Sequence, residues 1–302
     1  MAAASKTALI ALASAASWGG GDFSGGMGAK SAGGGVAGTV RFVVLAHALS
    51  LSVLLGILIV THAGLPHGAP VLWAILGGVT GALGLVAFYI ALGRGAMGAS
   101  AAVSGLLAAA IPAVVSSVLE GAPGVLRLAG FVIAAIAIWL IAAGDSPEST
   151  GESSTTMALA IAAGVAFGVY FVALRMANSL GLVAPMAIAR SSSLSLLGIG
   201  LLLRRVWSLK APQGVSTQKD EPHGAWFAGW PWAVGVALMD TGGNVLFVAA
   251  TRMGRLDIAS VLASLYPAAT IMLAAWHLHE RPTRRQVVGM VTALIAVVMV
   301  TV

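Results

Sequence analysis

Ten long apolar stretches follow one another along this 302-residue chain, and they restrict its possible folds more than any other feature. Between Arg41 and Arg94, and again between Arg94 and Glu120, no Asp, Glu, Lys or Arg occurs. Because a bilayer core about 30 Å thick needs roughly 20 apolar residues per helix, we interpret the stretches as membrane spans. Their apolar residues are continuous and do not alternate with polar ones, which favours helices over a β-barrel. The predicted spans are Thr7–Met27, Thr39–Val60, Val71–Leu92, Gly98–Leu119, Leu126–Ala143, Met157–Met176, Ala184–Leu203, Trp232–Ala250, Ile258–Leu278 and Arg285–Thr301.

The composition indicates an all-α integral membrane protein whose first partner is the lipid bilayer. Hydrophobic residues make up 59% of the chain and charged residues 9%, against about 25% charged in soluble proteins. The 16 Lys and Arg residues form no basic run, so we expect no nucleic-acid partner. Cysteine is absent, which excludes disulfides and thiolate metal sites, and we expect neither a metal nor a cofactor. The first stretch leads directly into Trp18 and Asp22, which favours a first span over a cleavable signal peptide.

The second five stretches repeat the first five. A spacing of 159 residues joins Trp73 to Trp232, Gly84 to Gly243, Phe88 to Phe247, Gly95 to Gly254 and Gly130 to Gly289. Near the start of each half the spacing is 149 residues, and it joins Trp18 to Phe167, Gly19 to Gly168 and Arg41 to Arg190. We therefore predict two five-helix repeats, residues 1–143 and 157–302, joined by a polar linker at 144–156. Repeats of this kind are typical of secondary transporters.

Glycines and prolines inside the spans indicate where helices approach closely or bend. Gly21-x-x-x-Gly25 and Gly77-x-x-x-Gly81 have the spacing that allows close backbone contact in lipid. Pro112 lies inside the fourth span and Pro267 inside the ninth, where each removes a backbone hydrogen bond and favours a kink. Broken helices often lie beside the substrate site of repeat-built transporters. A kink with only a packing role is the alternative for both prolines.

Apart from Arg127, Arg175 and Arg285 at the span ends, four charged side chains lie within the predicted spans, where charge is costly and usually faces a cavity or a partner. Asp22 is in the first span and Asp240 in the eighth, with Asn244 one turn further on, while Arg41 and Arg190 are in the second and seventh. One interpretation is that the carboxylates line a cavity, where one of them carries a proton or meets a cationic group. The other is that Asp22 pairs with Arg41 and Asp240 with Arg190 as structural ion pairs. An Arg190 facing the cavity would instead favour a carboxylate or phosphate on the substrate.

Aromatic side chains within the spans could stack on a substrate while their polar tips form hydrogen bonds. Most aromatic residues in spans serve only packing, but Tyr266 directly precedes Pro267 and is therefore a stronger candidate. Together with the polar residues of the spans, these side chains form the predicted substrate-binding set: Trp18, Asp22, Tyr89, Tyr170, Asp240, Asn244 and Tyr266.

The end of the ninth span and the start of the tenth resemble the drug/metabolite transporter superfamily, EamA type. The pattern runs from Leu265-Tyr266-Pro267 through Glu280-Arg281-Pro282-Thr283 to Gln286 and Gly289. Thr283 and Gln286 also suit a capping box that opens the last helix, and Gly289 suits tight packing. Trp18-Gly19 and Arg41-Phe42 look similar to the family as well, whereas in the first half Glu120-Gly121-Ala122 lacks the Arg and Arg127 replaces the Gln.

The resemblance implies ten helices, arranged as two inverted repeats around a central cavity, that move a small-molecule substrate by alternating access. With the residues of the spans, it leads us to expect a secondary transporter without enzymatic activity. We expect an exporter or exchanger of amino acids or related small polar or amphipathic compounds, with protons as the candidate coupling ion. Nucleotide sugars and cationic drugs are the alternative substrates, and a channel or a scaffold is the alternative class. The expected location is a bacterial cytoplasmic (inner) membrane.

The family resemblance and the distribution of charge predict opposite orientations. Members of the family usually place both termini in the cytoplasm. With that orientation, the predicted inner loops hold 5 Lys or Arg residues and the outer loops hold 9. The positive-inside rule would instead place both termini outside.

Overall fold

The structure is a computed structural model that describes residues 2–33, 35–62, 64–93, 97–142, 154–210, 229–278 and 283–301, and every regular element in these ranges is a helix. The long helices of the first half are α1 (Ala2–Ser31), α2 (Val36–Val60), α3 (Ala69–Gly93), α4 (Met97–Leu119) and α5 (Val125–Ala142). Those of the second half are α6 (Ser154–Met176), α7 (Ala184–Lys210), α8 (Trp230–Met253), α9 (Leu256–Ala263), α10 (Tyr266–Leu278) and α11 (Arg284–Thr301), with a short 3-10 helix, η1 (Asn178–Leu180), after α6.

Within the described residues, six segments are long and apolar enough to cross a membrane. They are α2, α3, α6, most of α7, α8 and the segment Leu256–His277, which contains α9 and α10. The membrane crossing of α1, α4, α5 and α11 stays a prediction. The chain is thus an all-α, multi-pass integral membrane protein. Most of the linker predicted at 144–156 lies outside the described residues, but Ser154–Thr156 already form the start of α6.

Large apolar side chains cover much of the outer surface. Val118 on α4, Trp139 on α5, Trp276 on α10 and Leu294 on α11 are all more than half exposed. Exposure of so much apolar area to water would be unfavourable, at about 25 cal/mol for each Å². Lipid chains remove this penalty, so these side chains indicate the lipid-facing surface.

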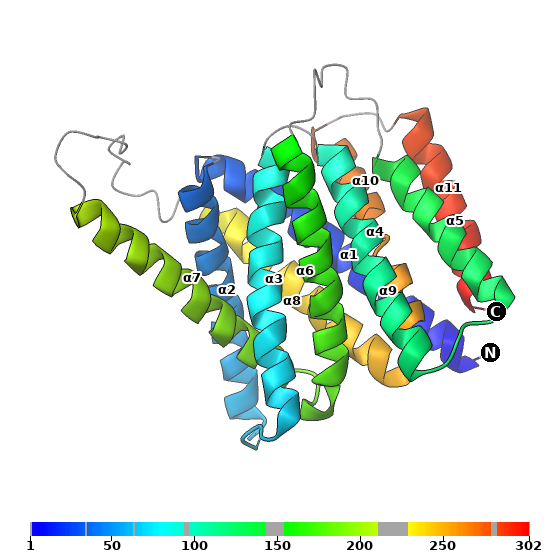
Figure 1. Ribbon diagram of the computed structural model, residues 1–302, viewed down its shortest axis with the longest axis horizontal. Helices are drawn as coiled ribbons and strands as arrows, with labels where there is room; N and C mark the ends of the chain where they lie inside the picture. The colour runs from blue at the N-terminus through cyan, green and yellow to red at the C-terminus, as the bar shows by residue number, and fades with distance from the viewer. Residues whose placement is uncertain are drawn as a thin grey trace.

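Helices from the two halves of the chain pack against one another rather than forming separate bundles (Figure 1). Helix α1 lies along α8 and also contacts α9 and α10, and α6 lies along both α3 and α4. Helix α5 pairs with α11 at one end of the molecule, and α2 pairs with α7 towards the other. The centre of the molecule is therefore bounded by α1 and α3 of the first half and by α6 and α8 of the second.

The ninth predicted span is broken just before Pro267, whereas Pro112 leaves its helix continuous. Helix α9 ends at Ala263 and α10 begins at Tyr266, so that Pro267 occupies the first turn of the new helix. A proline at this position costs no backbone hydrogen bond, because the first amides of a helix have no intrahelical acceptor. Helix α4 continues through Pro112 to Leu119.

The last helix begins with the predicted capping box. The Thr283 amide donates to Gln286 Oε1 at 2.8 Å, and the Gln286 amide donates to Thr283 Oγ1 at 3.3 Å. Gly289 packs directly on α5, where a methyl group at that position would lie 2.8 Å from the backbone nitrogen of Ile141. The Glu280–Pro282 part of the same motif lies outside the described residues.

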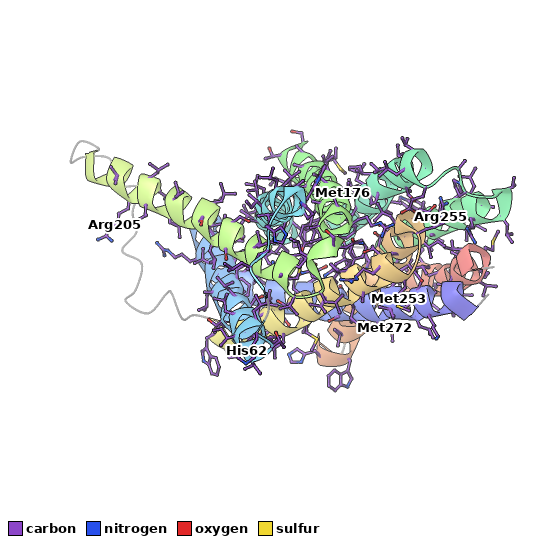
Figure 2. The ribbon with its side chains drawn as sticks, turned by 90° about the horizontal axis from the view of Figure 1, so that it is seen from below. His62, Met176, Arg205, Met253, Arg255 and Met272 are labelled. Carbon is purple, nitrogen blue, oxygen red and sulfur yellow. The ribbon has the colours of Figure 1, made fainter. Side chains whose placement is uncertain are left out.

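A charged cluster that includes Arg255 joins the two halves where α6 ends at Met176 and α8 ends at Met253. These three residues are labelled in Figure 2. Glu120, which follows α4, forms an ion pair with Arg175 of α6 at 2.9 Å and accepts a hydrogen bond from the Leu256 amide at 3.1 Å. Arg255 donates to the carbonyl oxygen of Glu120 at 2.9 Å and to the carboxylate of Asp257 at 2.8 Å. The cluster holds the α8–α9 junction against the ends of α4 and α6.

Substitution of Glu120 by glutamine is expected to lower the free energy of unfolding at pH 7 by about 1 kcal/mol, because water at the helix ends screens the ion pair. Burial alone would raise the pKa of Glu120, but hydrogen bonds from Ser116, Leu256 and Arg175 outweigh it and hold this pKa below its usual range. A lowered folded-state pKa stabilises the protein above the unfolded-state pKa, about 4.3, and this stabilisation is lost as the pH falls through the folded value. Thermal unfolding in detergent should therefore separate wild type from Glu120→Gln at pH 7 and bring them together in acid. A difference that does not depend on pH would contradict this origin.

Candidate functional site

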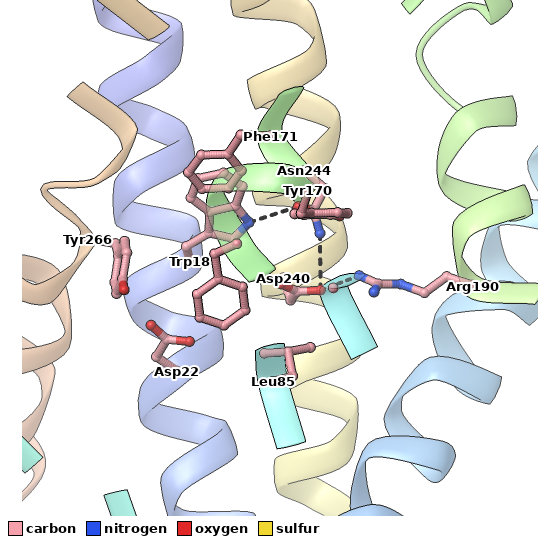
Figure 3. A pocket seen from close by; sticks show the side chains of 11 residues that line it. Trp18, Asp22, Leu85, Tyr170, Phe171, Arg190, Asp240, Asn244 and Tyr266 are labelled. Atoms are coloured by element: carbon pink, nitrogen blue, oxygen red, sulfur yellow. Dashed lines mark hydrogen bonds and ion pairs between the residues drawn. The ribbon is translucent and has the colours of Figure 1, made fainter. Parts of the chain in front are cut away.

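A cavity of about 40 Å³ lies between α1, α3, α6, α7, α8 and α10 in the centre of the molecule (Figure 3). Six of the seven residues in the predicted substrate-binding set line it, together with Arg190 and four residues outside that set. Its volume accommodates a few water molecules or one small chemical group, whereas binding pockets for small molecules are usually several hundred Å³. The lining residues are Trp18, Asp22, Gly81, Leu85, Phe167, Tyr170, Phe171, Arg190, Asp240, Asn244 and Tyr266.

Two of the predicted residues lie elsewhere. Tyr89 on α3 is only 2% exposed and packs beside Phe42 and Phe88, and Gly25 of α1 leaves room for its ring. Among the described residues, the cavity lining includes Arg190 but not Arg41. The structure therefore gives Tyr89 a packing position and leaves its predicted contact with substrate without support from the cavity lining.

The run Trp18-Gly-Gly-Gly-Asp22 lets α1 fit closely between α8 and α10. A methyl group at Gly19 would lie 2.8 Å from the Tyr266 carbonyl oxygen, and one at Gly21 would lie 3.2 Å from the Asp240 backbone nitrogen. The hydroxyl of Thr270 donates to the Gly19 carbonyl oxygen at 3.3 Å across the same contact. These glycines thus bring the side chains of Trp18 and Asp22 to the central cavity.

A hydrogen-bonded chain of side chains runs from α1 through α8 to α7 (Figure 3). Trp18 Nε1 donates to Asn244 Oδ1 at 3.1 Å, and Asn244 Nδ2 donates to Asp240 Oδ2 at 3.1 Å. Asp240 Oδ2 also accepts from Arg190 in an ion pair whose side chains are 15% and 5% exposed. The predicted pairing of Asp240 with Arg190 is therefore present.

Arg190 is held by further polar groups that the sequence analysis did not identify. Its Nε donates to Ser50 Oγ at 3.2 Å and its Nη1 to His47 Nε2 at 3.0 Å. Because a guanidinium group can only donate, His47 Nε2 is the acceptor, and its Nδ1 carries the proton and donates to Ser193 Oγ at 2.5 Å. Ser50 also forms a hydrogen bond of 2.5 Å with Thr241. All three nitrogens of the guanidinium group therefore have acceptors, and His47 is neutral in this arrangement.

Aromatic rings form one side of the cavity. Trp18 stacks on Phe171 with ring centroids 4.9 Å apart and an interplanar angle of 2°, and both rings contact Phe247. Tyr170 lies next to Phe171, with ring centroids 6.0 Å apart. Tyr266 is on the other side, where its hydroxyl lies 3.5 Å from Ser104 Oγ. The aromatic side chains thus offer flat apolar surfaces to a bound molecule.

Asp22 differs from Asp240 in having no partner among the described residues. It lines the cavity near Tyr266, and it makes no hydrogen bond or ion pair with any residue that the structure describes (Figure 3). Asp240 is neutralised by Arg190, so Asp22 is the carboxyl group of the described lining that has no counterion. The lining can bind and orient a small polar molecule through its carboxylates, amide and rings. Among the described residues, no group of three His, Cys, Asp or Glu side chains could hold a metal ion.

Comparison with known proteins agrees with this fold. Residues 154–302 match the sequence model of the EamA-like transporter family, which is part of the drug/metabolite transporter superfamily. A solved structure described only as "Crystal structure of protein" is similar over 98% of both chains, with a TM-score of 0.73 and 16% identity. At that identity the likeness shows a common fold alone. No curated protein matches the chain significantly.

Proposed function

The second half of this chain belongs to the EamA-like transporter family, and from this premise we propose that the whole chain is a secondary transporter. It moves small amphipathic metabolites across the bacterial cytoplasmic membrane by alternating access, as an exporter or exchanger. The observation that carries the proposal is the central cavity, which both halves of the chain line with polar and aromatic side chains. The proposal rests on two arguments, the relation between the halves and the position of the cavity.

Reciprocal contacts support the two five-helix repeats, residues 1–143 and 157–302. A methyl group at Gly84 would lie 2.7 Å from the Phe167 ring, and one at Gly243 would lie 2.5 Å from the Trp18 ring. These contacts are related by the repeat, because Gly243 follows Gly84 by 159 residues and Phe167 follows Trp18 by 149. Exchange of the two halves therefore converts one contact into the other.

The α5–α11 pair has the same property. Gly130 of α5 packs against Met299 and Val300 of α11, while Gly289 of α11 packs against Leu140 and Ile141 of α5. Each residue in the first contact is 159 positions from its counterpart in the second. Such reciprocity is what a two-fold axis between the halves produces. An axis in the membrane plane makes the repeats inverted, and the two halves can then rock around a site between them.

The cavity lies where such an axis would pass. Eight of its lining residues form four pairs at the repeat spacings of 149 or 159 residues. Movement of the halves about such an axis can expose a site on it to one side of the membrane or to the other, which alternating access requires. The pairs are Trp18 with Phe167, Asp22 with Phe171, Gly81 with Asp240 and Leu85 with Asn244.

Flux through proteoliposomes tests the proposal. Purified protein should take up members of a panel of amino acids, nucleotide sugars and organic cations, and uptake should saturate and rise when substrate is loaded inside. Flux without saturation or countertransport would indicate a channel, and no flux by protein verified as folded would favour a scaffold. The same assay with and without a pH gradient identifies or excludes protons as the coupling ion.

Substitution of Asn244 by leucine, the residue at the repeat-related position 85, is expected to reduce saturable flux at least about tenfold. The change keeps the number and branching of the side-chain heavy atoms but removes the hydrogen bonds to Trp18 and Asp240. The hydrogen bond to the charged Asp240 alone contributes about 1.5–3 kcal/mol. Leu238→Ala on the lipid-exposed face of α8 is the control and should keep its flux. Equal flux in the two variants would show that the cavity is not the transport site.

A further inference from the structure

The two walls of the cavity differ sharply in polarity at repeat-related positions. On the α1–α8 side, Asp22, Asp240 and Asn244 supply two carboxylates and an amide. At the corresponding positions of the α3–α6 side stand Phe171, Gly81 and Leu85. A molecule bound between the walls therefore meets polar groups on one side and an apolar surface on the other.

The charge of the polar wall is also one-sided. Arg190 is the only cation in the described lining, and its guanidinium group is already engaged by Asp240, Ser50 and His47. A substrate carboxylate or phosphate would have to compete with these acceptors, and it would also face the negative charge of Asp22. A positively charged group meets neither obstacle, because the Asp22 carboxylate has no partner among the described residues.

The aromatic side chains fit the same ligand. Trp18, Phe167 and Tyr170 line the cavity together with Phe171, and Tyr266 lies beside Asp22 (Figure 3). The faces of aromatic rings attract cations, and each such contact contributes about 0.5–2 kcal/mol. The rings also provide a flat apolar surface for a hydrocarbon or aromatic body.

We propose that the substrates are amphipathic organic monocations, in which an ammonium group binds the Asp22 carboxylate and an apolar body lies against the α3–α6 wall. This inference rests on the proposed transport function, because it assigns the substrate class of the same cavity. Binding of one monocation supplies the Asp22 carboxylate with a counterion. The cavity of about 40 Å³ accommodates the charged group, and entry of the apolar body requires the cavity to widen at the α3–α6 wall.

Four probes of similar size and different charge test the substrate class. They are 2-phenylethylammonium, neutral 2-phenylethanol, anionic 3-phenylpropanoate and zwitterionic phenylalanine, each titrated calorimetrically into purified wild-type protein at pH 7. The cation should bind about 10- to 100-fold more tightly than the alcohol or the anion, as expected for one charge-assisted hydrogen bond. Equal affinities, or tighter binding of the anion or zwitterion, would overturn the cation assignment.

Substitutions assign the binding to Asp22. Asp22→Asn should remove the preference for the cation over the alcohol, whereas Asp22→Glu should keep most of it. Glu120→Gln removes one negative charge outside the cavity and should retain the full preference. Retention of the preference in Asp22→Asn would overturn the role of Asp22. If Asp22→Asn does not fold, the wild-type series still tests the substrate class, and Asp22→Glu tests the role of Asp22. Loss of the preference for the cation in a folded Asp22→Glu protein would contradict that role.

Proteoliposome flux separates this inference from the proposed function. Saturable flux of the cation that depends on Asp22 supports both. Flux of phenylalanine or nucleotide sugars without flux or binding of the cation overturns the substrate class and leaves the transporter. Selective binding of the cation without flux of any compound supports the cation site and refutes transport.

Discussion

Replacing Arg190 with leucine is expected to lower the free energy of unfolding by about 3–5 kcal/mol, because the change leaves the Asp240 carboxylate buried without its counterion. The effect should exceed that of Asp240→Asn, in which the amide can still accept a hydrogen bond from Arg190. Arg190 also has acceptors in Ser50 and His47, and both lose their donor in the leucine variant. Thermal and denaturant unfolding in detergent, followed by far-UV circular dichroism, measures the change.

The double variant Arg190→Leu/Asp240→Asn isolates the ion pair from the other contacts. With both charges removed, the double variant should be more stable than the sum of the single effects predicts, by about 0.5–3 kcal/mol. Arg204→Leu, on an exposed part of the same helix, controls for the loss of a cation and should change stability little. Additive single effects would show that Arg190 and Asp240 do not interact in the folded protein.

The features that the sequence predicted correctly are those in which one residue type has a single low-energy environment. The Asp240–Arg190 pair is one, because a charge inside a span needs a partner. The capping box of Thr283 and Gln286 is another, because the first amides of a helix need acceptors. The helix break before Pro267 follows from its missing amide and ring geometry.

The features that the sequence did not predict depend on how each helix is rotated about its axis. Ser191 and Ser193 are two residues apart on α7, yet their hydrogen bonds differ. The Ser191 hydroxyl donates to the Ala187 carbonyl oxygen of its own helix, whereas the Ser193 hydroxyl accepts a hydrogen bond from His47. Any serine in a span can form a hydrogen bond with a carbonyl oxygen of its own helix, so the sequence alone does not reveal which serine binds another helix. The sequence could not separate Tyr89 from the residues that line the cavity for the same reason, since the sequence does not show which way an aromatic ring in a span points.

The apolar wall of the cavity escaped notice for a different reason. Leu85 and Phe171 are ordinary apolar residues of spans, and nothing in their own sequence context marks them. Their interest lies in the sequence spacing that relates them to Asn244 and Asp22. The proposed repeat, applied to the predicted polar residues rather than to the spans alone, would have identified them.

Substitution of Gly19 by alanine is expected to destabilise the contact between α1 and α10. The added methyl group would lie 2.5 Å from Ala269 Cβ and 2.8 Å from the Thr270 backbone nitrogen. These atoms belong to α10 itself rather than to the end of a flexible side chain, so α1 and α10 must separate. Overpacking of this kind costs about 1–3 kcal/mol. The movement also displaces Tyr266 from the cavity, so the flux should fall even in protein that stays folded.

Gly20 is the matched control, because it is the next residue of the same helix and has a different environment. A methyl group there would lie 3.4 Å from the side chain of Met239, which is flexible enough to move. Gly20→Ala should therefore be neutral or stabilising by up to about 1 kcal/mol, since alanine is the better helix former. The proposed repeat adds a second test: Gly168→Ala should behave like Gly19→Ala, because a methyl group at Gly168 would lie 2.7 Å from Ile111 Cβ. Unfolding temperature and flux should both be lower in Gly19→Ala and Gly168→Ala than in Gly20→Ala. Equal values in the three variants would show that the close contacts of α1 with α10 and of α6 with α4 do not maintain the cavity.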